Sequence, residues 1–207
     1  MTEFRIGVAL LAAGASRRFG EADKLAAQFR GRPLGEHAAS ALPQEKFARG
    51  WVITSVAGHP CEDHWRGCGL QPVVNPDAVK GMGSSVALAA SLAQEAGLDA
   101  LLVALADMPL VPREHYCALL GALKRPCDIA ASSNGDRNLP PAIFGSDFFT
   151  ALMELSGDQG ARKLIGESRS LDCPPDWLID IDSPQDLQDH GQAKSAQPKP
   201  PSKGDST

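Results

Sequence analysis

The fold of this chain is decided by the stretch Ile6-Gly7-Val8-Ala9-Leu10-Leu11-Ala12-Ala13-Gly14-Ala15-Ser16-Arg17-Arg18-Phe19-Gly20, which Lys24 closes. Its first half is an apolar run that predicts a buried β-strand. Its second half is a turn of small residues and glycine, which leaves backbone N–H groups uncovered. Oriented amides form a concave anion site, and Arg18 and Lys24 bring two cations to it. We therefore expect this turn to bind phosphate groups.

The glycine spacing of this turn differs from that of the common phosphate-binding loops. Gly14 and Gly20 fit neither the dinucleotide fingerprint nor the Walker loop. An ordinary strand–turn segment with surface cations is the alternative interpretation. The concentration of Gly, Ser, Arg and Lys in one loop after the first strand favours the functional interpretation.

The rest of the chain alternates short apolar runs with helical patterns, which predicts one α/β domain with a mostly parallel sheet in a three-layer α/β/α sandwich. We expect strands over 4–11, 50–57, 71–74, 100–106, 127–132, 139–144 and 177–181. We expect helices over 33–42, 83–96, 112–123, 145–155 and 158–165, and a last helix after Asp182. The domain is expected to span 1–190. Residues 191–207 are rich in Gln, Lys, Ser and Pro and are expected to be a disordered tail.

Composition narrows the class of protein. The chain has 207 residues, 43% of them hydrophobic, and a net charge of −5, which does not suggest a nucleic-acid surface. No apolar stretch is long enough to span a bilayer, and the N-terminus leads directly into the first strand without a signal peptide. We expect a cytoplasmic protein that binds neither nucleic acid nor membrane.

The cysteines do not form a disulfide pattern, because the five of them are scattered along the chain. His59, Cys61, His64 and Cys68 have spacings that could hold zinc. No Cys-x-x-Cys pair anchors such a site, so we interpret this segment as a loop that leads into a short helix.

A second candidate site follows the run Leu101-Leu102-Val103-Ala104-Leu105-Ala106, which predicts a central strand covered on both faces. Asp107 comes directly after it, in Asp107-Met108-Pro109. Open α/β sheets bind ligands at the carboxyl ends of their strands, and Mg²⁺ prefers one or two carboxylates together with substrate phosphates. Asp107 is therefore a candidate magnesium ligand, with a simple turn before the proline as the alternative.

Two further segments join predicted strands to predicted helices. Asn75-Pro76-Asp77-Ala78-Val79-Lys80-Gly81-Met82-Gly83-Ser84-Ser85 contains glycines that allow close backbone approach and serines that can donate hydrogen bonds at a helix end. In Gly157-Asp158-Gln159-Gly160-Ala161-Arg162, Asp158 is a plausible N-cap and Arg162 would project from the first helical turn. Plain helix caps are the alternative interpretation of both segments.

These motifs, in this order, resemble the nucleotidyltransferases that modify the molybdenum cofactor, within the wider superfamily of nucleotide-diphosphosugar transferases. The resemblance covers about residues 4–188. It implies that the first loop holds a nucleoside triphosphate and that the aspartate of Asp-x-Pro coordinates catalytic magnesium. It also implies a second metal ligand before the Ser183-Pro184-Gln185-Asp186-Leu187 helix start, which places it at Asp182 rather than Asp180. Gly35 replaces a bulky apolar residue of the family, and we expect it to weaken the helix at 33–42.

The resemblance assigns the site residues as follows. The catalytic positions are Arg18, Lys24 and Asp107, the metal ligands are Asp107 and Asp182, and the pterin side holds Asp158 and Arg162. The nucleotide-binding positions are Leu11, Ala12, Ala13, Gly14, Arg18, Lys24, Asn75, Gly83 and Ser84.

The implied reaction transfers CMP from CTP to the terminal phosphate of the molybdenum-bound pterin cofactor, with Mg²⁺ as metal and pyrophosphate as leaving group. The Ala12-Ala13-Gly14 form resembles the cytidine-using branch. Alternatives are a guanylyltransferase that uses GTP with the same pterin, a sugar-phosphate nucleotidyltransferase, and a non-catalytic carrier of the cofactor. Transient docking to a molybdoenzyme or its chaperone is also expected.

Overall fold

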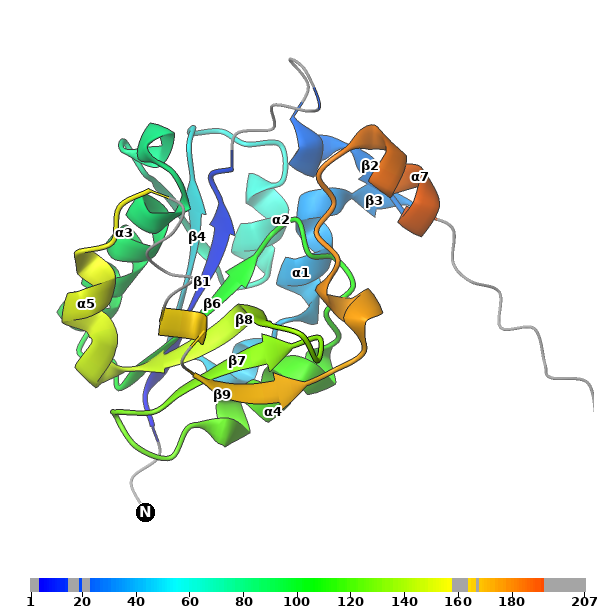
Figure 1. Cartoon of the computed structure of the whole chain (residues 1–207). Coiled ribbons are helices and arrows are strands. Elements are labelled where there is room, and N and C mark those ends of the chain that lie inside the picture. Colours follow the sequence, from blue (N-terminus) through cyan, green and yellow to red (C-terminus); the bar gives the residue numbers. More distant parts are fainter. Residues whose placement is uncertain (1–3, 15–18, 20–22, 158–163, 167, 192–207) are drawn as a thin grey trace, which may run out of the picture.

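The computed structural model describes residues 4–14, 19, 23–157, 164–166 and 168–191. A seven-stranded sheet forms the middle layer, in the order β5-β4-β1-β6-β8-β7-β9 (Figure 1). Its strands are β1 Ile6–Ala12, β4 Arg49–Thr54, β5 Gln71–Val74, β6 Ala100–Leu105, β7 Ile129–Ser133, β8 Asn138–Gly145 and β9 Arg169–Asp172. Neighbouring strands are parallel except where β8 pairs with β6 and β7. The predicted mostly parallel α/β sheet is confirmed.

Helices cover both faces of the sheet. The α-helices are α1 Leu34–Ala41, α2 Glu62–Gly67, α3 Met82–Glu95, α4 Arg113–Ala122, α5 Phe149–Met153 and α7 Pro184–Gly191. Single 3₁₀ turns are η2 Lys24–Ala26, η3 Gln44–Lys46, η4 Ala78–Lys80, η5 Ser146–Phe148 and η6 Pro175–Leu178. Helices α3 and α5 lie on one face, and α1, α2 and α4 lie on the other (Figure 1). Across the described residues, no helix combines the length and the apolar character that a membrane crossing needs.

Strand β1 lies between the two cores, and its residues alternate between them. Val8 and Leu10 are fully buried in the core under α1, α2 and α4. Ala9 and Leu11 face the core under α3 and α5. This burial on both faces explains why the strand reads as a continuous apolar run rather than an alternating one.

A small hairpin that we did not predict follows the first loop. It pairs β2, Gln28–Phe29, with β3, Arg32–Pro33. Its two-residue turn has positive φ at both positions, 47° at Arg30 and 86° at Gly31, as a tight hairpin turn requires. The guanidinium of Arg30 donates to the carbonyl of His190 at 2.9 Å, which ties the hairpin to α7.

The strand expected over 177–181 is wrong. Residues Pro175–Leu178 form η6, since Pro174 and Pro175 supply fixed φ angles and no N–H for a sheet ladder. The seventh strand is β9, which we did not predict, and it pairs in parallel with β7. Three of its four residues are exposed, so β9 is an edge strand without the apolar signal on which sequence reasoning depends.

Candidate active site

The candidate active site lies at the carboxyl ends of β1 and β6, where the strand order reverses. After β1 the chain builds β4 and β5 on one side, and it then returns to place β6 on the other side of β1. Such a switch point opens a crevice between the loops that leave the two strands. The backbone N–H of Ala106 donates to the carbonyl of Leu11 at 3.0 Å, which joins the residue after β6 to the end of β1.

Three charged side chains from distant parts of the sequence meet at this point. The ammonium of Lys24, in η2, lies 2.6 Å from Oδ2 of Asp107 and 2.8 Å from Oδ1 of Asp182. Asp107 follows β6, and Asp182 precedes α7. Oδ1 of Asp107 is buried and has no hydrogen-bond partner among the described residues. The two aspartates that the resemblance assigned to a metal therefore converge, and a cation lies between them.

Backbone contacts bring Asp182 to this position. The N–H of Ile181 donates to the carbonyl of Asp107 at 2.9 Å. Asp186 then fixes the start of α7: its Oδ2 accepts from the N–H of Ser183 at 2.8 Å, and its own N–H donates to Oγ of Ser183 at 3.2 Å. This reciprocal pair is the relative of the capping box that the sequence predicts.

Burial and charge act on the cluster in opposite directions. For Lys24, burial lowers the pKa, but the attraction of Asp107 and Asp182 outweighs it, so that the pKa is raised overall. Burial raises the pKa of Asp107, against the opposing attraction of Lys24. Lys24 is therefore a protonated cation at neutral pH and compensates carboxylate charge at the edge of the core.

A cavity of about 390 Å³ opens beside this cluster. Asp107 lies at its wall, together with Leu11, Ala13 and Gly14 from the end of β1 and the loop after it. Other lining residues come from the segment after β5, from α3 and from β6: Ala78, Val79, Gly81, Met82, Ser85 and Leu105. The cavity thus combines an acidic end with an apolar wall, as expected of a site for a molecule with a charged and a flat apolar part.

The segment from Asn75 to Ser85 is held by its own polar groups. The side-chain amide of Asn75 donates to Oγ of Ser84 at 2.9 Å and to Oγ of Ser85 at 3.0 Å. Ser84 in turn donates to the carbonyl of Gly81 at 2.8 Å. Asn75 and Ser84 therefore order this loop, whereas Ser85 is the serine that lines the cavity.

Gly83 lies where two candidate motifs meet. Its N–H donates to the carbonyl of Gly157 at 2.8 Å, and a Cβ atom on Gly83 would lie 2.5 Å from that carbonyl oxygen. Only glycine allows this approach of α3 to the chain just before Asp158. Arg18, Asp158 and Arg162 themselves lie outside the described residues, and their assignments stay predictions.

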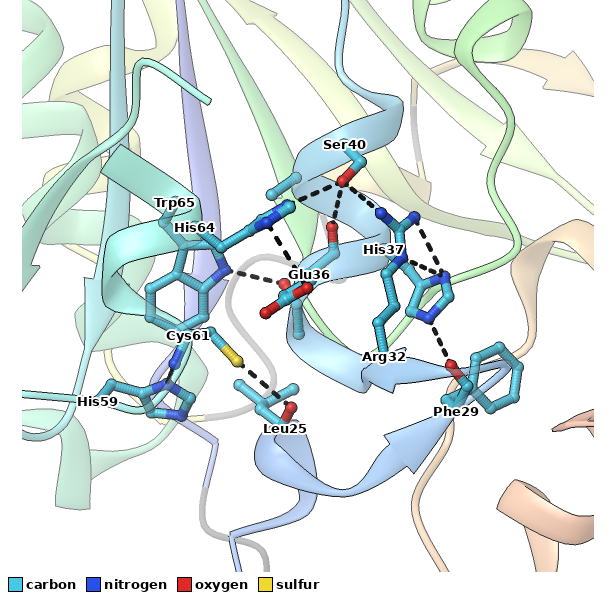
Figure 2. Close-up of polar contacts among 12 residues, drawn as sticks. Leu25, Phe29, Arg32, Glu36, His37, Ser40, His59, Cys61, His64 and Trp65 are labelled. Carbon is cyan, nitrogen blue, oxygen red and sulfur yellow. Dashed lines mark hydrogen bonds and ion pairs between the residues drawn. The ribbon is translucent and has the colours of Figure 1, made fainter. Parts of the chain in front are cut away.

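The side chains of His59, Cys61 and His64 each contact a different residue outside the segment 59–68, and Figure 2 shows these contacts for Cys61 and His64. Nε2 of His59 lies 2.6 Å from Oδ2 of Asp23. Sγ of Cys61 donates to the carbonyl of Leu25 at 3.5 Å, and Nε2 of His64 lies 2.9 Å from Oγ of Ser40. Sequence reasoning missed the contact between Asp23 and His59. The only signal was an aspartate directly before Lys24, at the N-cap of η2.

Comparison with known proteins agrees with this geometry. The family model of the MobA-like NTP transferase domain matches residues 8–172. The chain belongs to the MobA-like NTP transferase family. It is 31% identical over 201 residues to the purine catabolism protein PucB of Bacillus subtilis (strain 168), covering 88% of this chain and 94% of that one. This MobA-like chain is therefore a nucleotidyltransferase.

Solved structures share the fold of this MobA-like domain. Rv0371c from Mycobacterium tuberculosis H37Rv superposes with a TM-score of 0.73 and 22% identity, covering 93% of this chain and all (100%) of that one. A nucleotidyl transferase from Methanothermobacter superposes with a TM-score of 0.74 and 16% identity, covering 90% and 96%. These likenesses confirm the expected α/β fold with a mostly parallel sheet.

Proposed function

We propose that this nucleotidyltransferase transfers CMP from CTP to the terminal phosphate of a molybdenum-bound pterin cofactor. The observation that carries the proposal is the convergence of Lys24 and Asp182 on Asp107, which lines the cavity. In this reaction an oxygen of the acceptor phosphate attacks the α-phosphorus of CTP. A new bond forms between this oxygen and the α-phosphorus. At the same time the bond breaks between the α-phosphorus and the oxygen that bridges to the β-phosphorus. Pyrophosphate leaves with the electron pair of the broken bond.

The donor set suits a divalent metal. Two carboxylates face each other across Lys24, and Oδ1 of Asp107 is buried without a partner in the described residues, which fits a hard cation with oxygen ligands. Asp107 and Asp182 would hold Mg²⁺. When bound, the metal neutralises the triphosphate and orients its oxygens. Rv0371c from Mycobacterium tuberculosis, whose fold this chain shares, has been solved in complex with manganese, which supports a divalent metal for this chain.

In this proposal Lys24 has one role in the free enzyme and another in the enzyme with bound nucleotide. In the free enzyme its ammonium compensates the two aspartates, as the distances indicate. We propose that its flexible stem lets the ammonium turn from the carboxylates to the triphosphate once the metal–nucleotide complex is bound, where it stabilises charge on the leaving pyrophosphate. Arg18 is proposed to act on the same phosphates. The acceptor phosphate is already an anion, so the reaction needs no general base.

The apolar wall is proposed to receive the rings of the substrates. Two large apolar side chains at the cavity are exposed to water: Val79 is 90% exposed and Met82 is 42% exposed. Large apolar side chains are usually more buried than this. A flat heterocycle placed against them would remove this surface from water. The choice of cytosine rests on the Ala12-Ala13-Gly14 form of the first loop.

The proposal is tested with a panel of CTP, GTP, ATP and UTP, each incubated with Mg²⁺ and the isolated pterin cofactor. Release of pyrophosphate is followed by a coupled phosphatase assay. The proposal requires CTP to give the highest kcat/KM. A preference for GTP would assign the guanylyl-transferring alternative, and no release with any nucleotide would leave a non-catalytic carrier. Sugar phosphates as acceptors complete the panel.

A further inference from the structure

We propose that His59 is a positioning residue, which holds Asp23 and thereby keeps the turn that carries Lys24 in place at Asp107 and Asp182. The inference rests on the proposed function for its kinetic consequence, but its structural part is independent of the substrate. It concerns a side chain outside the cavity lining, on the loop between β4 and α2. His59 therefore acts through other residues rather than on the reacting atoms.

Lys24 lies in η2, which is a single turn of 3₁₀ helix. It starts at the N-cap Asp23, whose Oδ1 accepts from the N–H of Leu25 at 2.9 Å. One turn of 3₁₀ helix has little stability of its own. The position of the lysine ammonium therefore depends on what holds Asp23 from outside the turn.

His59 provides that outside contact. Its Nδ1 accepts from the N–H of Cys61 at 3.0 Å, so the ring proton lies on Nε2. Nε2 in turn lies 2.6 Å from Oδ2 of Asp23, a close contact of the ion-pair type without the alignment of a hydrogen bond. The two carboxylate oxygens of Asp23 thus have different tasks: one caps η2, and the other faces the histidine. Contact with His59 is the main reason that the pKa of Asp23 is lowered.

The His59 ring is itself fixed by the core. It is 6% exposed and stacks on Trp65, with ring centroids 4.5 Å apart and an interplanar angle of 27°. The indole N–H of Trp65 donates to the carbonyl of Gly35 in α1 at 2.8 Å (Figure 2). A Cβ on Gly35 would lie 3.3 Å from the Trp65 ring and 3.1 Å from Leu25, so the glycine allows α1, α2 and η2 to pack closely. Helix α1 forms with Gly35 in its first turn, and Gly35 serves this contact.

A second contact also joins the loop after β4 to η2. Sγ of Cys61 donates to the carbonyl of Leu25, the residue after Lys24, at 3.5 Å (Figure 2). The loop after β4 therefore contacts the turn on either side of the lysine, at Asp23 and at Leu25. This arrangement holds the backbone on both sides of Lys24.

The test compares His59→Phe with His59→Gln. Phenylalanine keeps an aromatic ring on Trp65 but has no N–H for Asp23, whereas the glutamine amide restores a donor near the position of Nε2. His64→Phe is the matched control. It removes a histidine of the same segment, but the described contacts of His64 are with Glu36 and Ser40, away from the turn.

The first readout is independent of activity: the rate at which limiting acetic anhydride acetylates Lys24, measured by mass spectrometry relative to the exposed Lys80. We expect the rate to rise about fivefold in His59→Phe, because the ammonium leaves its buried ion pairs more often, and to stay near wild type in His59→Gln and His64→Phe. An unchanged rate in folded His59→Phe overturns the inference.

A second variant guards against failure of His59→Phe to fold. Asp23→Asn keeps an oxygen that can cap Leu25 but turns an amide NH₂ toward Nε2–H of His59, so two donors face each other. The Asp23 side chain is 38% exposed, which makes the change tolerable for folding. Lys24 acetylation must rise in this variant too, and an unchanged rate here contradicts the inference.

The kinetic readout is a double-mutant cycle with Lys24→Met. We expect kcat to fall about tenfold in His59→Phe, the size expected when a buried polar contact to a carboxylate is lost, with recovery in His59→Gln. In the Lys24→Met background His59→Phe should cause no further loss, whereas equal losses in both backgrounds would show a merely structural role and overturn the inference. If acetylation rises as expected but no nucleotide is turned over, the positioning role stands and the proposed function fails.

Discussion

Replacement of Lys24 by Met removes the cation between Asp107 and Asp182 while it keeps the length of the side chain. The two carboxylates then face each other without the ammonium that lies between them in wild type. The Lys24 side chain is 9% exposed, Asp107 is 21% exposed and Asp182 is 41% exposed. The perturbation therefore acts on two groups that are largely removed from water and on one that water still reaches.

The expected cost follows from this graded burial. Removal of one partner from a fully buried ion pair destabilises a protein by about 3–5 kcal/mol. Water around Asp182 screens part of the repulsion, so we expect a loss of about 2–3 kcal/mol. For a chain of this size, that corresponds to a decrease in Tm of about 4–12 °C. Mg²⁺ alone should restore most of it, because the position between the carboxylates is then open to a cation.

Thermal unfolding of wild type and Lys24→Met, with and without MgCl₂, measures both effects. Lys80→Met is the matched control, because Lys80 forms an exposed ion pair with Asp77 that should contribute little. Asp182→Asn in the Lys24→Met background should recover stability by relieving the repulsion. An unchanged Tm in Lys24→Met, or an equal response to MgCl₂ in both proteins, would refute the reasoning.

Three further predictions concern packing and ionisation. Burial raises the pKa of the Cys61 thiol to about 12. Iodoacetamide at pH 8 should therefore alkylate the exposed Cys127 faster than Cys61 by about 100-fold or more, as peptide mapping would show. Similar rates at the two cysteines would contradict this prediction. Because the pKa of Asp23 is lowered, this carboxylate stabilises the folded protein above the ordinary carboxyl pKa of about 4, and the stabilisation is lost as pH falls through the lowered value. In urea unfolding between about pH 5 and 2.5, the free energy of unfolding should fall more steeply with pH in wild type than in His59→Phe. Equal slopes in the two proteins would contradict this prediction. Gly145→Ala should cost about 2 kcal/mol in urea unfolding, because its Cβ would overlap the backbone of Pro126, and a neutral effect would exclude this overlap.

The sequence predicted the elements that are buried on both faces. Strands β1 and β6 appear as long apolar runs because each lies between two helical layers, and such runs have few alternative structures. The edge strand β9 and the hairpin around Gly31 could not be predicted in this way. They are short and contribute little apolar area, and the prolines before η6 broke a run that otherwise resembled a strand.

In the candidate site, too, some features could be predicted from the sequence and others depend on the fold. Lys24 and Asp107 could be named from the segments that follow two apolar runs, whereas Asp182 was named only through the resemblance to a known family. Their mutual contact could not be predicted, because it joins residues 83 and 158 positions apart and depends on the strand order. The contact of Asp23 with His59 has no periodic signal at all, since it joins two loops.

The most direct test of the account follows the α-phosphate itself. Wild type and Asp107→Asn are incubated with CTP labelled at the α-phosphorus, MgCl₂ and the pterin cofactor. The account predicts that the label appears on the cofactor, in an amount equal to the pyrophosphate released, and that Asp107→Asn shows neither while its Tm indicates a folded protein. Label that stays with free nucleotide in wild type, or a near-normal transfer rate in Asp107→Asn, would contradict it.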